Sequence, residues 1–246
     1  MLTIATLFSC GEKSSSTKVI NTGIPAEHIE ATPAQKERRE KSETYCKQHN
    51  IPIYGNPNAM FSDTDADVML RTKDEVVNRA LALCFIGLKS EGLSVEDLRG
   101  IDAKYHIASK LTPVEKEYVY ADHPTEQQKS NANWRYEGLH TLLWALGYVE
   151  QLSYPDQMCN VANDVKIIHD LSEQGFRDKA ILRSKKDILD QADLILRLDW
   201  ACVDARTNNK PAPGKLNAEV VYERHYALNW LTHYSNQDWD DVSTDT

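Results

Sequence analysis

The residues of this chain best suited to proton-transfer chemistry lie near its C-terminus, in the stretch VVYERHYALNWL at positions 220–231. Glu223, Arg224 and His225 follow one another there, within an otherwise apolar helical pattern. Carboxylates close to Arg and His are the groups used in general acid–base catalysis. Residues two apart on a helix point about 200° away from each other, so Glu223 and His225 are not expected to face one substrate together. A structural role is therefore favoured, and a catalytic one stays open.

A helical wheel separates these three residues. At about 100° per residue, Arg224 falls in the middle of the apolar arc. Glu223 lies at one edge of that arc, beside Trp230, and His225 lies at the other, beside Asn229. Because an unpaired buried charge costs several kcal/mol, we expect Arg224 to bind a carboxylate within the core.

Two other predicted helices also place a charged residue on an apolar arc. These residues are Arg135, before a run of leucines, and Asp199, between Ile195 and Val203. Since Arg can bind a carboxylate through two parallel hydrogen bonds, we expect Asp199 to pair with one or both arginines inside a helical bundle. Glu137 and Glu223 are reserve acceptors. The helix of Asp199 also carries a narrow polar strip, formed by Asp193, Arg197 and Asp204.

The same charged residues supply the candidates for a site. A catalytic cluster would use Glu137, Asp199, Glu223 or His225, and the candidate binding residues are Arg135 and Arg224 as anion clamps, Asp204 and Trp200. The sequence contains no HExxH, GxSxG, phosphate-binding loop or GxGxxG motif. It therefore offers no recognisable metal, nucleophile or nucleotide site.

Cysteine and histidine spacing gives no indication of a metal or other cofactor, and none is expected. The five cysteines include no CxxC pair and no Cys/His spacing typical of zinc sites. His140 and His233 have no second His at metal-binding spacing on their helices, so we expect them on solvated or lightly packed faces.

Composition restricts the class of protein. The chain has 246 residues, and its 28 basic and 37 acidic side chains give a formal charge of -9. Nucleic-acid binding is not expected, because phosphates require clustered Lys and Arg. The remaining partners are an unknown protein or a small ligand.

Helix start signals recur along the chain. Ser, Thr or Asn residues suited to N-capping precede most of the apolar periodic segments. No segment shows convincing strand alternation, so the sequence predicts a mainly α protein, a single multi-helix bundle with little or no β structure. The expected helices are 33–49, 72–88, a short one from 112, 125–148, 160–172, 184–206 and one from 217.

The N-terminus resembles a bacterial lipoprotein signal. A short apolar run, Leu2 to Phe8, is followed by Ser9-Cys10-Gly11 and a Ser-rich stretch. This predicts a signal remnant over 1–9, lipid attachment at Cys10, a flexible tether over 10–31 and a helical domain over 32–246. The expected location is the cell envelope, with membrane contact through lipid only, and the alternative is the cytoplasm if the segment is not a signal.

Four ordered motifs resemble the bacterial family named domain of unknown function 4272. They are WRYEGL (134–139) running into LLWALG (142–147), RLDWACVDAR (197–206), ERHYALNWL (223–231) and WDDVSTDT (239–246). The resemblance covers roughly residues 70–246 and implies no activity, cofactor or partner.

Two hypotheses about function remain. The first is a noncatalytic helical domain, tethered to a membrane by lipid, that binds a protein or a small ligand through a groove. The second is an enzyme, such as a hydrolase, that uses the buried charged cluster. An open cleft onto which the charged side chains converge would favour the enzyme, and a closed network would favour the binding domain.

Overall fold

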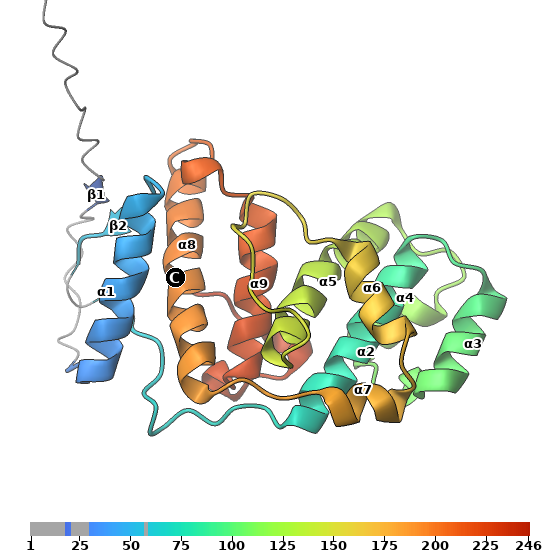
Figure 1. Cartoon of the computed structure of the whole chain (residues 1–246). Helices are drawn as coiled ribbons and strands as arrows, with labels where there is room; N and C mark the ends of the chain where they lie inside the picture. Colours follow the sequence, from blue (N-terminus) through green and yellow to red (C-terminus); the bar gives the residue numbers. More distant parts are fainter. Residues whose placement is uncertain (1–17, 21–29, 57–58) are drawn as a thin grey trace, which may run out of the picture.

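The computed structural model describes residues 18–20, 30–56 and 59–246. Helices dominate this part of the chain (Figure 1), which confirms the mainly α prediction. A pair of two-residue strands, β1 (Val19–Ile20) and β2 (Ile53–Tyr54), runs parallel. The nine α-helices of the described residues are α1 (Pro33–Gln48), α2 (Lys73–Ser90), α3 (Val95–Tyr105), α4 (Pro113–Tyr120), α5 (Glu126–Ala145), α6 (Val161–His169), α7 (Glu173–Lys179), α8 (Lys185–Thr207) and α9 (Ala218–Leu231).

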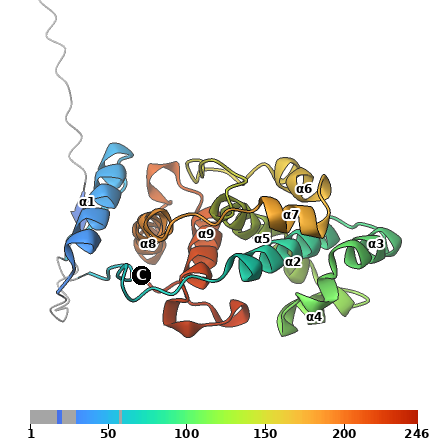
Figure 2. The same cartoon turned by 60° about the horizontal axis from the view of Figure 1, so that its bottom comes forward.

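The long helices pack in an order different from their order in sequence. α1 packs on α8, α8 on α9, α9 on α5, and α5 on α2 (Figures 1 and 2). α6 contacts α5, and α7 contacts α2. Helices α8, α9 and α5 therefore each lie between two other helices of this row.

Side-chain caps define where most helices begin. Thr72 is a representative case, because its hydroxyl accepts a hydrogen bond from the backbone N–H of Glu75 while the Glu75 carboxylate bonds back to Thr72. The same reciprocal arrangement precedes α1, α4 and α5. Two helices, α3 and α7, were not predicted, although Ser94 and Ser172 cap them through their side chains.

Asp193 and Arg197, two members of the predicted polar strip of α8, are buried. Asp193 is 0% exposed and Arg197 is 7% exposed. They form an ion pair one turn apart, with 2.9 Å between Arg197 Nη2 and Asp193 Oδ1. Helix α1 packs against α8, and the two charged side chains pair with each other out of contact with solvent.

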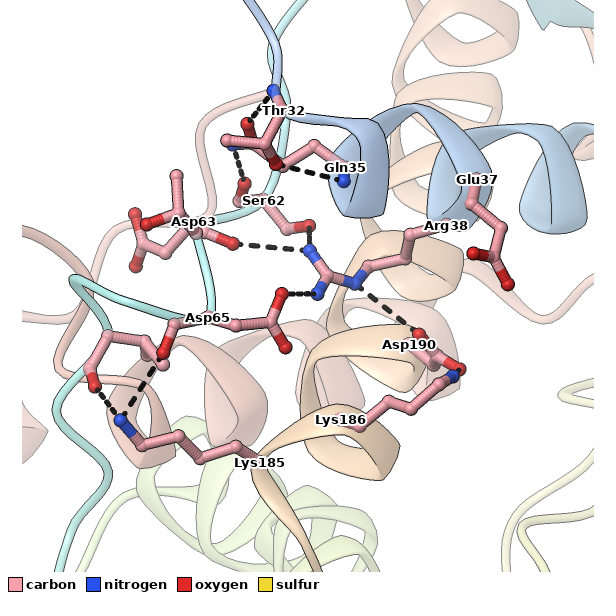
Figure 3. Close-up of polar contacts among 12 residues, drawn as sticks. Thr32, Gln35, Glu37, Arg38, Ser62, Asp63, Asp65, Lys185, Lys186 and Asp190 are labelled. Atoms are coloured by element: carbon pink, nitrogen blue, oxygen red, sulfur yellow. Dashed lines mark hydrogen bonds and ion pairs between the residues drawn. The ribbon is translucent and has the colours of Figure 1, made fainter.

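Arg38 connects α1 to the chain that follows it and to α8 (Figure 3). Its buried guanidinium donates to the Ser62 hydroxyl at 3.1 Å and the Asp63 carbonyl at 3.2 Å, and pairs with Asp65 at 2.8 Å. Its Nε lies 3.4 Å from an oxygen of Asp190 on α8. One side chain thus fixes α1, the segment 62–65 and α8 relative to one another.

Of the predicted N-terminal signal and tether, the structure describes only residues 18–20 and 30–31. Val19 and Ile20, inside the segment expected to form a tether, pair with Ile53 and Tyr54. Cys10 and the expected signal lie outside the described residues. No helix within the described ranges has the length and apolar character needed to cross a membrane.

The contact between α2 and α5 depends on a glycine. A Cβ added to Gly87 would lie 2.5 Å from Cζ of Tyr136, whose side chain is fully buried. Tyr136 therefore packs directly on the α2 backbone.

We expect Gly87→Ala to lower the free energy of unfolding by about 1–3 kcal/mol, because overpacking outweighs the gain in helix propensity of about 1 kcal/mol. Urea denaturation would measure the change. Gly100→Ala in α3 is the matched control, because no atom lies within 4 Å of its added Cβ, and it should stabilise the protein slightly. A Gly87→Ala protein at least as stable as wild type would contradict the packing argument.

Candidate functional site

The charged residues singled out in the sequence form three separate pairs. Arg224 Nε lies 3.1 Å from Glu137 Oε2, and Arg135 Nη1 lies 3.0 Å from Glu223 Oε2. His225 Nδ1 lies 2.7 Å from Asp199 Oδ2. The predicted pairing of Asp199 with an arginine is therefore wrong, and the two reserve acceptors are the partners of the arginines. Asp199 faces the imidazole of His225 instead.

Helix α9 is enclosed on more sides than the wheel predicted. Arg224 is 1% exposed, which confirms its predicted place in the core, but Glu223 and His225 are also only 5% and 2% exposed. α5 and α8 both pack on α9, and the C-terminal segment contacts it as well. The ring of Trp239 lies edge-on to Tyr226, with 5.1 Å between centroids, so the C-terminal segment packs on α9.

The Arg135–Glu223 pair lies nearest to solvent. The Arg135 side chain is 23% exposed and its guanidinium lies 4.3 Å from the centroid of the Tyr226 ring. Burial raises the pKa of Glu223 above its ordinary value, and the nearby Arg135 opposes that shift. A carboxyl group with a raised pKa is suited to proton transfer only where a substrate can reach it.

The Arg224–Glu137 pair also holds the loop between α5 and α6. Arg224 Nη1 donates to the carbonyl of Ser153 at 2.6 Å, and Glu137 Oε1 accepts a hydrogen bond from the backbone N–H of Cys159. The remaining nitrogen of the guanidinium, Nη2, is buried and has no hydrogen-bond partner among the described residues. The pair thus satisfies two loop groups and leaves one donor of Arg224 free.

Arg224 lines a cavity of about 440 Å³, which we call the Arg224 cavity. An adjoining cavity of about 340 Å³ shares four of its lining residues, Tyr45, Trp144, Gln191 and Leu194, so the two form one continuous depression beside α8. The other residues lining the Arg224 cavity are Gln151, Leu152, Ser153, Tyr154, Pro155, Ile195 and Leu198.

The candidate catalytic residues do not meet in this space. Glu137, Asp199 and Glu223 line neither part of the depression, and His225 borders a separate void of only about 30 Å³. Trp200 stacks on Tyr54, with 5.0 Å between ring centroids. The remaining candidate, Asp204, accepts a hydrogen bond from Asn208 at the end of α8.

A larger cavity of about 460 Å³ lies at the opposite end of the row of helices, between α2, α3 and α4. Val95, Leu98 and Leu111 contribute apolar surface, and Lys89 and Asp102 contribute charge. Among its lining residues, none has a buried polar side-chain atom that lacks a partner. The Arg224 cavity is the stronger candidate because one of its lining residues, Arg224, has such an atom.

The structure brings together a second group that the sequence analysis missed: His140, Cys159 and Asp164. His140 was expected on a solvated or lightly packed face, but its side chain is only 12% exposed and its Nδ1 lies 2.9 Å from Asp164 Oδ2. One potential ligand atom from each of the three residues lies within 4.8 Å of the others. The residues come from α5, the following loop and α6, so no short motif could have revealed them.

Cys159 is not poised as a nucleophile in this group. Burial, together with the carboxylates of Glu137 and Asp164, raises the pKa of its thiol well above the ordinary value. A reactive cysteine requires the opposite shift, because the thiolate is the nucleophilic form. The arrangement therefore does not support cysteine-dependent hydrolysis.

The fold and the sites described above define an all-α domain in which a buried arginine, Arg224, lines a cavity. Residues 38–242 match the family described as Domain of unknown function (DUF4272), and the chain belongs to that family. The match begins earlier than the region recognised in the sequence and includes most of α1. No curated protein and no solved structure matches the chain.

We expect Arg224→Met to lower the free energy of unfolding by about 3–5 kcal/mol, because it leaves the carboxylate of Glu137 buried without its charge partner. Denaturant titration would measure the loss. The double variant Arg224→Met/Glu137→Gln should recover part of it, since no unpaired carboxylate remains. Arg135→Met is the comparison variant and should cost less, because its pair is partly solvated. An Arg224→Met protein as stable as wild type would show that the Arg224–Glu137 pair does not support the fold.

Proposed function

We propose that this protein is a noncatalytic binding domain that holds a small molecule in the Arg224 cavity. The observation that carries the proposal is the free Nη2 of Arg224, a buried donor on a residue that lines the cavity. Unpartnered buried donors are rare in folded proteins because each costs about 1–3 kcal/mol. The volume of about 440 Å³ lies within the range of roughly 300–1,000 Å³ for small-molecule sites.

The lining indicates which chemistry the ligand would have. An oxygen of a carboxylate or phosphate could accept a hydrogen bond from Arg224 Nη2, the strongest kind that an Arg offers. Trp144 and Tyr154 supply aromatic surface on which a flat ring could pack. Gln151 and Gln191 can donate or accept hydrogen bonds. The ligand class that fits is a ring with an acidic substituent.

The arrangement of the carboxylates favours binding over catalysis. Each candidate catalytic carboxylate has its own side-chain partner, an arginine for Glu137 and Glu223 and His225 for Asp199, and none of the three lines the depression beside α8. General acid–base catalysis requires these groups within hydrogen-bond reach of a bound substrate. The hydrolase hypothesis therefore has less support.

The second part of the proposal is that lipid on Cys10 tethers the domain to a membrane of the cell envelope. Its support is the sequence alone, an apolar run followed by Ser9-Cys10-Gly11 and a polar stretch. Several acyl chains on one cysteine give durable anchoring.

We expect small aromatic carboxylates and aryl phosphates to bind this protein more tightly than their uncharged analogues do. Crystallographic soaking should place the acidic compounds in the Arg224 cavity with an oxygen on Nη2, and thermal shifts should exceed those of the analogues. Leu194→Trp should block binding by filling the depression, whereas Val119→Trp, in the cavity beside α4, should not. Acidic compounds that bind elsewhere, or equally well to Leu194→Trp, would contradict the proposal.

We expect the protein expressed in bacteria from its own start to incorporate a labelled fatty acid. Cys10→Ala should abolish the label and release the protein from the membrane fraction. Cys202→Ala, which removes a buried cysteine of α8, should retain both. An unlabelled wild-type protein would rule out the lipid anchor and leave the cavity proposal untouched.

A further inference from the structure

The cluster of His140, Cys159 and Asp164 lies where α5, the following loop and α6 meet. Asp164 is 2% exposed, and its Oδ2 lies 2.9 Å from Nδ1 of His140. The Cys159 thiol lies 3.6 Å from the carbonyl of Tyr136, at the distance of a weak hydrogen bond. A buried carboxylate, an imidazole and a thiol thus meet, and no Lys or Arg side chain of the described part of the chain is bonded to any of them.

We propose that His140, Cys159 and Asp164 bind one Zn²⁺ ion. Thiolate sulfur, imidazole nitrogen and carboxylate oxygen are the three ligand types that zinc takes from proteins. Ca²⁺ and Mg²⁺ are poor candidates because they require oxygen ligands, six or more for Ca²⁺ and an octahedron for Mg²⁺.

The geometry is close to that of a zinc site. The three ligand atoms lie within 4.8 Å of one another. Zinc bonds of about 2.0–2.3 Å with tetrahedral angles require ligand atoms roughly 3.3–3.8 Å apart, so side-chain movements of roughly 1 Å would be sufficient. The half-buried Cys159 lies in a loop, where such a movement meets less resistance than within a helix.

Charge balance also favours a divalent cation. The thiolate and the carboxylate carry two negative charges, and a neutral imidazole adds none, so Zn²⁺ brings the group to zero. Uncompensated charge in a buried site is costly, which makes a neutral assembly favourable there.

Glu137 holds the cluster without being available as a ligand. Its Oε1 accepts the backbone N–H of Cys159 and its Oε2 bonds to Arg224, so both oxygens are engaged. Glu137 therefore positions the cysteine, in the manner of the outer residues that orient metal ligands. Three protein ligands then leave the fourth coordination position of zinc to water.

The test is metal binding to the full chain after treatment with a chelator. We expect one Zn²⁺ per chain by competition with a chromophoric chelator, and a Co²⁺ complex whose absorption includes a sulfur-to-cobalt charge-transfer band. Cys159→Ser and Asp164→Asn should each weaken Zn²⁺ binding at least about tenfold, and Cys159→Ser should abolish the band. Cys202→Ser is the matched control and should retain both the stoichiometry and the band.

Three results would overturn the proposal: no stoichiometric Zn²⁺ binding by wild type, unchanged affinity in both ligand variants, or a wild-type Co²⁺ complex without the charge-transfer band. If the variants do not fold, the wild-type Co²⁺ spectrum decides, because it reports sulfur coordination directly. None of these measurements depends on the Arg224 cavity, so this proposal and the small-molecule proposal stand or fall separately.

Discussion

The buried carboxylate of Glu137 is the constraint on which much of this structure depends. It is 0% exposed, and a charge in that position is tolerated only with a partner and full hydrogen bonding. One oxygen takes the guanidinium of Arg224 from α9, and the other takes the backbone N–H of Cys159. Arg224 in turn binds the carbonyl of Ser153. One ion pair therefore fixes the packing of α5 on α9 and the path of the loop that borders both proposed sites.

Local signals in the sequence were sufficient to predict most helices and the place of Arg224. N-caps such as Thr72 act within one helical turn, so their effect can be read from neighbouring residues. The apolar arc around Arg224 is also a property of one helix. α3 and α7 were not predicted, although Ser94 and Asp97 stand at the spacing of a cap before α3 and Ser172 caps α7.

The pairing of charges could not be predicted from the same information. The wheel shows which side of a helix a residue occupies, but a partner also depends on how far the neighbouring helix is shifted along its axis and how it is rotated. Glu137 rather than Asp199 meets Arg224 because α5 and α8 lie on different sides of α9. The burial of Asp193 could not be predicted for a similar reason, since no pattern within α8 indicates that α1 packs on this helix. The His140 cluster joins three elements and has no one-dimensional signature at all.

Free polar atoms in the core do not all carry the same meaning. Arg79 and Arg197 each leave Nε without a partner, and the acid paired with each leaves one oxygen in the same state. The four residues of these two ion pairs line neither the depression beside α8 nor the cavity beside α4. The pair of Arg224 and Glu137 differs from these two. Both carboxylate oxygens of Glu137 have hydrogen-bond partners, and the atom without one is Nη2 of Arg224, a residue that lines the Arg224 cavity. A ligand oxygen there would remove a desolvation cost of about 1–3 kcal/mol that the folded protein otherwise bears. A ligand bound to Arg224 would stabilise the loop near Ser153, whose carbonyl Arg224 binds, and a metal would stabilise the same loop at Cys159. The two proposed sites therefore share this loop, which Arg224 and Glu137 hold in place.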